Sequence, residues 1–145
     1  MTEPVIVDTG PLVALLNRRD NWHEWAKEQF GLLQAPLLTC EAVITEATHL
    51  LRRTPEGSDA VLEMMARDLL RLEFDLAADL ADVRQLMRRY RNVPMSLADA
   101  CLVKMAEHHA RSKVLSLDAD FRRYRRRGRQ VIPLIQPRDK VEGER

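Results

Sequence analysis

The sequence predicts an α/β fold in which short, buried strands alternate with helices and pair as a parallel sheet. The run Val5-Ile6-Val7 is apolar on every residue, which is typical of a strand covered on both faces, and 113–117 is a second short run rich in Val and Leu. Between them lie longer segments whose apolar side chains recur at helical spacing. Strands that alternate with helices in this way form βα units, which build a parallel sheet.

Turn-forming residues divide the chain into its expected elements. Gly10-Pro11 ends the first strand and opens a helix, because proline is tolerated in the first helical turn, and 54–58 (TPEGS) is a clear turn. Residues 118–125 are expected to form a helix or a turn, and a short strand could lie at 71–74. We expect strands at 4–8, 35–39, 113–117 and 130–135, helices at 11–17, 23–33, 40–53, 59–70, 75–91 and 96–109, and a frayed tail from about residue 136.

Length and composition indicate one soluble domain. The 145 residues are enough for one domain with a proper core, whereas two separate domains would each be marginal. The net charge of +1 argues neither for nor against a nucleic-acid partner. Cys40 and Cys101 stand in apolar surroundings and are expected to be buried, reduced thiols. With no signal peptide and no membrane-spanning run in this sequence, we expect a cytoplasmic protein.

Two acidic residues follow predicted strands directly. Asp8 comes after the first strand, and Asp118 comes after the strand at 113–117. Ligands of open parallel sheets bind beyond the carboxyl ends of the strands, so both side chains stand where a functional site is expected. Aspartate is also a favoured helix N-cap, which is the structural alternative for each residue.

Two further acids lie on predicted helices in apolar surroundings. The neighbours of Glu46 one turn away are Ala42, Val43, His49 and Leu50, which places its carboxylate on or beside the buried stripe. The alternative is a Glu at the rim that reaches water or pairs with an arginine. Asp99 has no basic residue within four positions, and 96–99 (SLAD) also matches a capping box with Asp in place of the usual Glu. A capping Asp99 could still face a ligand from the first helical turn.

The four carboxylates together predict a divalent-metal site. Several anions cannot share a small volume without a counter-charge, and no lysine or arginine lies within four positions of Asp8, Glu46 or Asp99 in the sequence. Carboxylates and waters suit Mg²⁺ or Mn²⁺. Such ions generate hydroxide from bound water and neutralise phosphate oxygens, which favours phosphodiester hydrolysis.

These four motifs resemble those of PIN domains, in order and in spacing. The family pattern is similar to 5–10 (VIVDTG), 45–47 (TEA), 96–100 (SLADA) and 115–121 (LSLDADF), and the resemblance runs from about Pro4 to Leu134. It is strongest to VapC-like toxins of bacterial toxin–antitoxin pairs. It implies a three-layer α/β/α sandwich, Mg²⁺- or Mn²⁺-dependent endoribonuclease activity, a homodimer, and a small antitoxin partner whose tail covers the site.

The resemblance also implies roles for residues around the acids. Thr9 and Ser116 match hydroxyl positions that help to hold the metal site or the phosphate. Both Asp118 and Asp120 are available for the fourth acidic position; placement at the strand end favours Asp118, which leaves Asp120 a supporting or capping role.

A run of arginines follows the fourth acid and is a candidate RNA-binding surface. Arg122, Arg123, Arg125 and Arg126 could contact phosphates, although a solvated basic surface is an equal alternative. The leading hypothesis is a metal-dependent endoribonuclease toxin. The alternatives are a catalytically inactive module of the same fold that binds RNA or a protein, and another α/β metal hydrolase such as a phosphatase.

Overall fold

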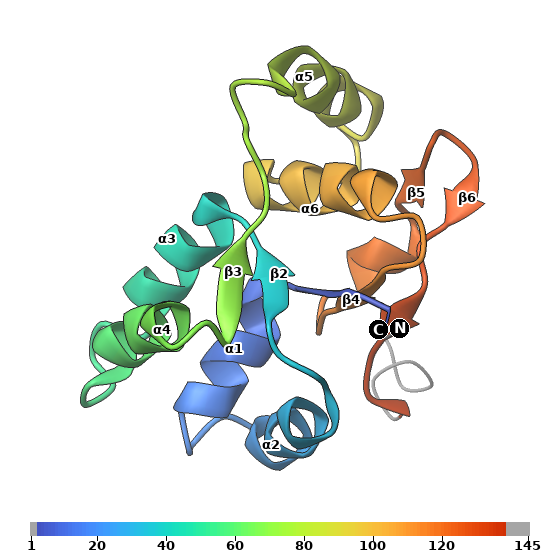
Figure 1. Ribbon diagram of the computed structural model, residues 1–145. Helices are drawn as coiled ribbons and strands as arrows, with labels where there is room; N and C mark the ends of the chain where they lie inside the picture. Colours follow the sequence, from blue (N-terminus) through green and yellow to red (C-terminus); the bar gives the residue numbers. More distant parts are fainter. Residues whose placement is uncertain (1–2, 139–145) are drawn as a thin grey trace.

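A five-stranded, fully parallel sheet forms the centre of the protein (Figure 1). The structure is a computed structural model that describes residues 3–138. The strand order is β3-β2-β1-β4-β7. The strands are β1 (Val5–Val7), β2 (Leu37–Thr39), β3 (Leu70–Leu72), β4 (Lys113–Leu115) and β7 (Leu134–Ile135). All three residues of β1 and of β2 are buried, as expected for strands covered on both faces.

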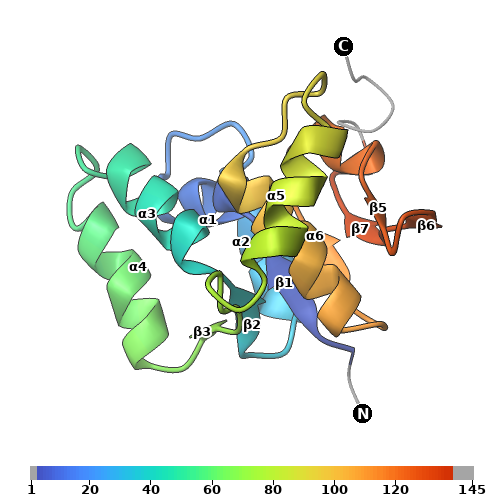
Figure 2. The same cartoon turned by 90° about the horizontal axis from the view of Figure 1, so that it is seen from above.

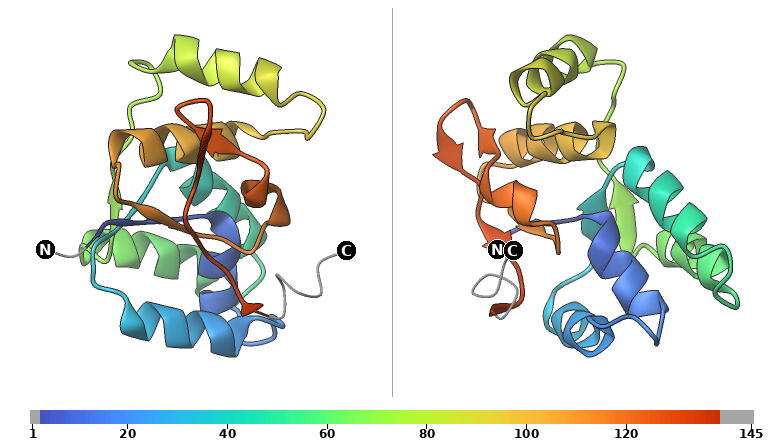
Figure 3. Two further views of the ribbon diagram at one scale, coloured as in Figure 1. Left: turned by 90° about the vertical axis from the view of Figure 1, so that its right-hand side faces the viewer. Right: turned by 180° about the vertical axis from the view of Figure 1, so that it is seen from behind.

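Helices cover both faces of the sheet. They are α1 (Thr9–Leu16), α2 (His23–Leu32), α3 (Glu41–Leu50), α4 (Gly57–Ala66), α5 (Leu80–Arg89) and α6 (Leu97–His108). α6 crosses one face with α5 packed outside it, whereas α1 and α2 lie on the opposite face and α3 and α4 pair beside α1 (Figures 1 and 3). The predicted three-layer α/β/α sandwich is therefore confirmed.

The chain order creates a switch point in the middle of the sheet. β1, β2 and β3 follow one another toward one edge, and the chain then returns so that β4 pairs with the other side of β1. Ligands of open α/β sheets bind at such a point, in the crevice beyond the carboxyl ends of the strands. Figure 1 shows α6 and α1 on opposite sides of β1, and the view from above shows β1 leading into α1 (Figure 2).

Several element boundaries differ from the sequence prediction, most clearly at three places. The helix expected at 59–70 ends at Ala66, because Asp68 adopts a left-handed backbone conformation and the chain continues into β3. The helix expected from residue 75 begins only at Leu80. The strand expected at 130–135 is interrupted at Pro133, which lacks an N–H for ladder pairing.

The interrupted segment divides between two sheets. β6 (Gln130–Val131) pairs antiparallel with β5 (Arg125–Arg126) in a hairpin, and β7 joins the central sheet beside β4. Residues 118–125 form the short 3₁₀ helix η1 (Ala119–Arg122) and the start of this hairpin. The expected frayed tail lies mostly outside the described residues.

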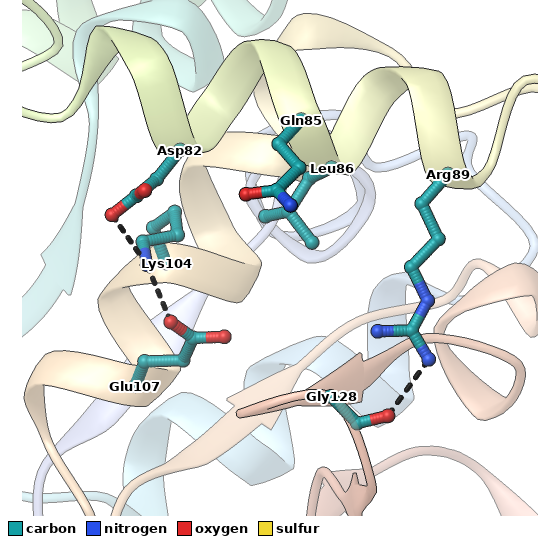
Figure 4. Close-up of a pocket in the computed structure, with 7 residues that line it drawn as sticks. All are labelled: Asp82, Gln85, Leu86, Arg89, Lys104, Glu107 and Gly128. Atoms are coloured by element: carbon teal, nitrogen blue, oxygen red, sulfur yellow. Dashed lines mark hydrogen bonds and ion pairs between the residues drawn. The ribbon is translucent and has the colours of Figure 1, made fainter.

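Polar contacts fasten α5 and the hairpin to α6. Lys104 of α6 contacts Asp82 of α5 at 3.2 Å and Glu107 at 2.5 Å, and Arg89 of α5 donates to the Gly128 carbonyl at 2.7 Å (Figure 4). These contacts line a hollow of about 500 Å³ and hold in place the helix whose first turn carries Asp99.

Both cysteines are buried free thiols, as predicted. Among the described residues, no helix combines the length and the apolar character that crossing a membrane requires.

Candidate active site

The pairing of β1 with β4 brings two strand ends together. Val7 is the register partner of Leu115, and the Asp8 N–H donates to the Leu115 carbonyl at 3.0 Å, so Asp8 and Ser116 follow the strands side by side. The Ser116 hydroxyl donates to Asp8 Oδ2 at 2.8 Å and accepts from the Asp118 N–H at 2.9 Å. One buried serine therefore orients both strand-end acids.

Asp99 reaches the same place from the first turn of α6. The expected capping box is present: Asp99 N–H donates to Ser96 Oγ at 3.0 Å, and Ser96 N–H donates to Asp99 Oδ2 at 3.2 Å. The Tyr124 hydroxyl donates to the same Oδ2 at 3.0 Å. Capping and site placement therefore coexist, because these bonds use one carboxylate oxygen and leave Oδ1 for another partner.

Asp8 and Asp118 likewise act as helix N-caps and also lie at the site, so the two alternatives that the sequence left open are both realised. Asp8 caps α1 by accepting from the Thr9 N–H at 2.7 Å, and Asp118 caps η1 by accepting from the Asp120 N–H at 2.9 Å. Each carboxylate oxygen has more than one acceptor direction, so a cap bond does not exhaust it.

The three aspartates form one compact group. One carboxylate oxygen from each of Asp8, Asp99 and Asp118 lies within 4.8 Å of the other two. Asp8 is 6% exposed and Asp99 is 8% exposed, and none of the ion pairs formed within residues 3–138 involves the group. Buried like charges at this spacing need a cation or a proton, and an oxygen-only ligand set with open water positions suits a hard divalent ion.

The electrostatics of the protein without metal agree with this need. Burial raises the pKa of Asp8 from 3.8 to about 7, against the opposing hydrogen bonds from Thr9 and Ser116, and the charges of Asp99 and Asp118 raise it further. Burial also raises the pKa of Asp99 above its ordinary value, and the bonds from Ser96 and Tyr124 oppose that rise. A cation bound between these oxygens would reverse both shifts, because it favours the ionised forms.

Glu46 is placed differently from the expectation. Its side chain is exposed rather than on a buried stripe, and its neighbour Leu50 is 53% exposed. Helical spacing identified a common face, but that part of α3 faces solvent, so the alternative of a Glu at the rim is correct. Glu46 lies outside the 4.8 Å group and is joined to it by the Thr9 hydroxyl, which donates to Oε1 at 2.6 Å.

Of the two candidates for the fourth acidic position, Asp118 is the one that lies in the group of aspartates. Asp120 is half-buried, contributes its N–H to Asp118, and is absent from the group of aspartate oxygens. The Gln136 side chain donates to the Asp118 carbonyl at 3.0 Å, which ties the loop after β4 to the end of β7.

The arginine run does not form one surface. Arg126 is only 9% exposed and turns inward, where its guanidinium donates to the carbonyls of Ala106 and Ser112. Its assignment to the RNA-binding surface is therefore wrong, because its charge satisfies backbone acceptors inside the domain. Arg123 is exposed, whereas Arg122 and Arg125 are half-buried and donate to nearby carbonyls.

Tyr124 is a site residue that the sequence analysis missed. It is fully buried, stacks edge-on against Phe121 and Tyr90, and donates to Asp99. Burial and the charge of Asp99 raise the pKa of Tyr124 above its ordinary value, which keeps the hydroxyl protonated as a donor. An aromatic pair at 121 and 124 inside a run of arginines was the available indication of an inward face.

The fold and the site define an α/β/α sandwich with an acidic centre at the switch point of its sheet. The chain belongs to the PIN domain family, whose model matches residues 5–127. A comparison with curated proteins gave no significant match. The fold is similar to the crystal structure of Mycobacterium tuberculosis VapC20, described as a Sarcin-Ricin loop cleaving toxin, with a TM-score of 0.73 and 23% identity over 80% of this chain and 91% of that one.

Proposed function

We propose that this chain is a single-domain, metal-dependent endoribonuclease and the toxin of a toxin–antitoxin pair. The observation that carries the proposal is the convergence of three aspartate oxygens within 4.8 Å, at the switch point of a PIN fold. Family membership supports a nuclease, and the fold shared with a toxin described as cleaving the Sarcin-Ricin loop supports RNA as the substrate class.

Asp8, Asp99 and Asp118 would hold Mg²⁺ or Mn²⁺. When bound, such an ion supplies an activated water and neutralises charge on the phosphate oxygens. Ser116 fixes the carboxylate of Asp8 and the backbone of Asp118. Tyr124 and the capping box orient Asp99 through its Oδ2 and leave Oδ1 available for the ion.

Glu46 and Thr9 act at the rim of this centre. The Thr9 hydroxyl holds Glu46 Oε1, and the exposed carboxylate can accept a proton from a water that enters with the substrate. Asp120 supports Asp118 through its backbone, and the exposed Arg123 and half-buried Arg122 and Arg125 border the loop after β4, where RNA phosphates would pass.

The proposal includes a homodimer, a small antitoxin and a cytoplasmic location, where RNA is available. The fold shared with a VapC toxin supports both partners, and the exposed Leu50, Leu62 and Leu80 are candidate contact residues. Light scattering of the purified chain, alone and with the product of a neighbouring short reading frame, tests both associations.

The test of catalysis compares wild type with Asp99→Asn on labelled RNA in Mg²⁺, in Mn²⁺ and in EDTA. Asparagine can keep the bonds from Ser96 and Tyr124 through its carbonyl oxygen, so the variant removes charge and leaves the cap intact. Asp59→Asn, an exposed acid of α4, is the matched control. We expect metal-dependent cleavage that Asp99→Asn loses and Asp59→Asn retains. Inert wild-type protein with either metal, across several RNA classes, would instead favour a module that binds RNA or protein without cleaving it.

A further inference from the structure

Three arginines line a hollow of about 640 Å³ at the ends of α1 and α3. Arg18 and Arg19 come from the loop after α1, and Arg53 comes from the loop between α3 and α4. Asn17 and Thr54 add polar groups to the same hollow, and no acidic side chain lines it. The hollow is thus a cationic surface built from two loops that are far apart in sequence.

Hydrogen-bonded turns hold both loops in place. Asp20 N–H donates to the Asn17 carbonyl at 3.0 Å, and the Asn17 side chain accepts from the Arg19 N–H at 3.1 Å. Thr54 N–H donates to the Leu51 carbonyl at 3.0 Å. The arginines therefore project from ordered backbone, so that little entropy is lost in the loops when a ligand binds.

Close packing keeps the second turn against α4. A Cβ at Gly57 would lie 2.9 Å from the Leu51 carbonyl oxygen and 2.9 Å from Thr54 Cβ, which is closer than real contacts allow. The turn that presents Arg53 is thus fixed by a position that admits only glycine without rearrangement.

The three guanidinium groups have no carboxylate partner within the part of the chain that the structure describes. All three side chains are exposed, and none takes part in the ion pairs formed there. Arg67 pairs with Glu63 and Arg71 with Asp68, whereas Arg84, Arg88 and Arg111 also form no ion pair within the described residues, so it is the grouping of three such arginines in one hollow that distinguishes this site. Planar donors that are left unpaired in one hollow are suited to bind phosphate oxygens.

The cationic surface ends at α4. An adjoining hollow shares Leu16 with the first one and is lined by Glu56, Asp59 and Glu63, together with Arg67. An RNA strand that occupies the arginine hollow would be repelled along α4 and would leave along α1 instead.

Helix α1 connects this hollow to the acidic centre. It begins at Thr9, directly after Asp8, and ends at Leu16, which lines the hollow. Its 8 residues span roughly 12 Å at 1.5 Å per residue. A single RNA strand can span that length within a few nucleotides.

We propose that Arg18, Arg19 and Arg53 bind the phosphate backbone of single-stranded RNA a few nucleotides from the bond to be cleaved. The proposal rests on the proposed ribonuclease function, because it assigns the RNA strand a path from the acidic centre along α1. It accounts for the unpaired arginines, the two ordered turns and the absence of acids in the hollow.

The test replaces the three arginines with glutamine, in the Asp99→Asn background so that RNA is bound but not cleaved. The control replaces three other exposed arginines, Arg84, Arg88 and Arg111, which removes the same charge from α5 and the loop after α6. The affinity for a labelled single-stranded RNA of about a dozen nucleotides is measured between 50 and 200 mM salt. If three phosphate contacts are lost, the slope of log K against log salt becomes shallower by about 2. Between 50 and 200 mM salt, the affinity of the protein with all three arginines should then fall roughly 20-fold more than the affinity of the triple-glutamine variant.

Two companion measurements separate this proposal from the proposed function. In the first, the three arginines of the hollow are replaced by glutamine in the protein that keeps Asp99. This hollow variant should lose cleavage of long RNA and keep cleavage of a dinucleotide, which is too short to reach the hollow. Equal salt slopes for the hollow variant and the control overturn the proposal even if the wild type cleaves RNA. An RNA-inert wild type whose binding still depends on these arginines refutes catalysis and supports the RNA surface. If the variant loses binding of polyglutamate and keeps the RNA slope, the hollow binds an acidic protein segment and the proposal is wrong.

Discussion

The charge of Asp8 makes the stability of the metal-free protein depend on pH. Burial raises the pKa of this carboxyl from 3.8 to about 7 in the folded chain. A group whose pKa is raised by folding contributes stability at low pH, and that contribution is lost as the pH rises through the folded-state value. The metal-free protein should therefore lose stability between about pH 4 and pH 7.

The magnitude follows from the size of the shift. One pKa unit corresponds to about 1.4 kcal/mol, so a rise from 3.8 to about 7 corresponds to roughly 4 kcal/mol at pH 8. Asp8→Asn removes the titration. The asparagine can accept from Thr9 N–H and donate to Ser116 Oγ, which already accepts from the Asp118 N–H.

Urea unfolding in EDTA, from pH 4.5 to pH 8, tests this reasoning. The free energy of unfolding of Asp8→Asn relative to wild type should rise by roughly 2 to 4 kcal/mol across that range. Mg²⁺ or Mn²⁺ should stabilise wild type at pH 8 and leave the variant unchanged. The control Asp59→Asn alters an exposed acid and should show neither effect. A difference between Asp8→Asn and wild type that stays constant with pH would refute the account of Asp8 as a buried carboxylate in need of a cation.

Two further predictions concern the residues that orient the acids. Tyr124→Phe removes the donor to Asp99 and should lower metal affinity or cleavage about 10- to 100-fold in titrations and rate assays. The control Tyr90→Phe loses only a hydrogen bond from the backbone N–H of Arg125 and should have no such effect. Equal effects of the two substitutions would contradict the role of the Tyr124 hydroxyl. Thr9→Val removes the bond to Glu46 and should slow cleavage about ten-fold or more with a change of about 1 kcal/mol or less in unfolding free energy, because Glu46 is exposed. Thr9→Ser keeps the hydroxyl and should restore the rate, and a slow serine variant would show that the methyl group matters instead.

The sequence was informative where local patterns and the geometry of parallel sheets leave few choices. The apolar run at 5–7 gave β1, and the SLAD segment gave both the capping box and the start of α6. Because parallel strands end at the same edge of a sheet, the position of Asp8 and Asp118 after their strands was enough to predict that they would lie together. The lengths of the helices were less well predicted: α4 ends at Ala66, shortly before the left-handed Asp68, a position at which the sequence has no glycine to signal the end of a helix.

The sequence pattern of a helix or loop could not show which of its sides would be covered by other elements. The spacing of Glu46 and Leu50 fitted a buried stripe, but that part of α3 meets solvent, since helical periodicity reports a common face and not its neighbour. Arg126 looked like its exposed neighbours in the run and is buried, because the hairpin folds it onto the carbonyls of Ala106 and Ser112.

The amino-acid sequence by itself determined the order of strands and helices and the acids that follow the strands. Only the tertiary structure decided that Tyr124 holds Asp99, that Thr9 joins Glu46 to the centre, and that Arg18 and Arg53 share one hollow. Periodicity and capping act over a few residues, whereas these contacts join residues 25 to 37 positions apart in the two hydrogen bonds. They form when the packed sheet and helices bring distant segments together, and no local pattern encodes that distance.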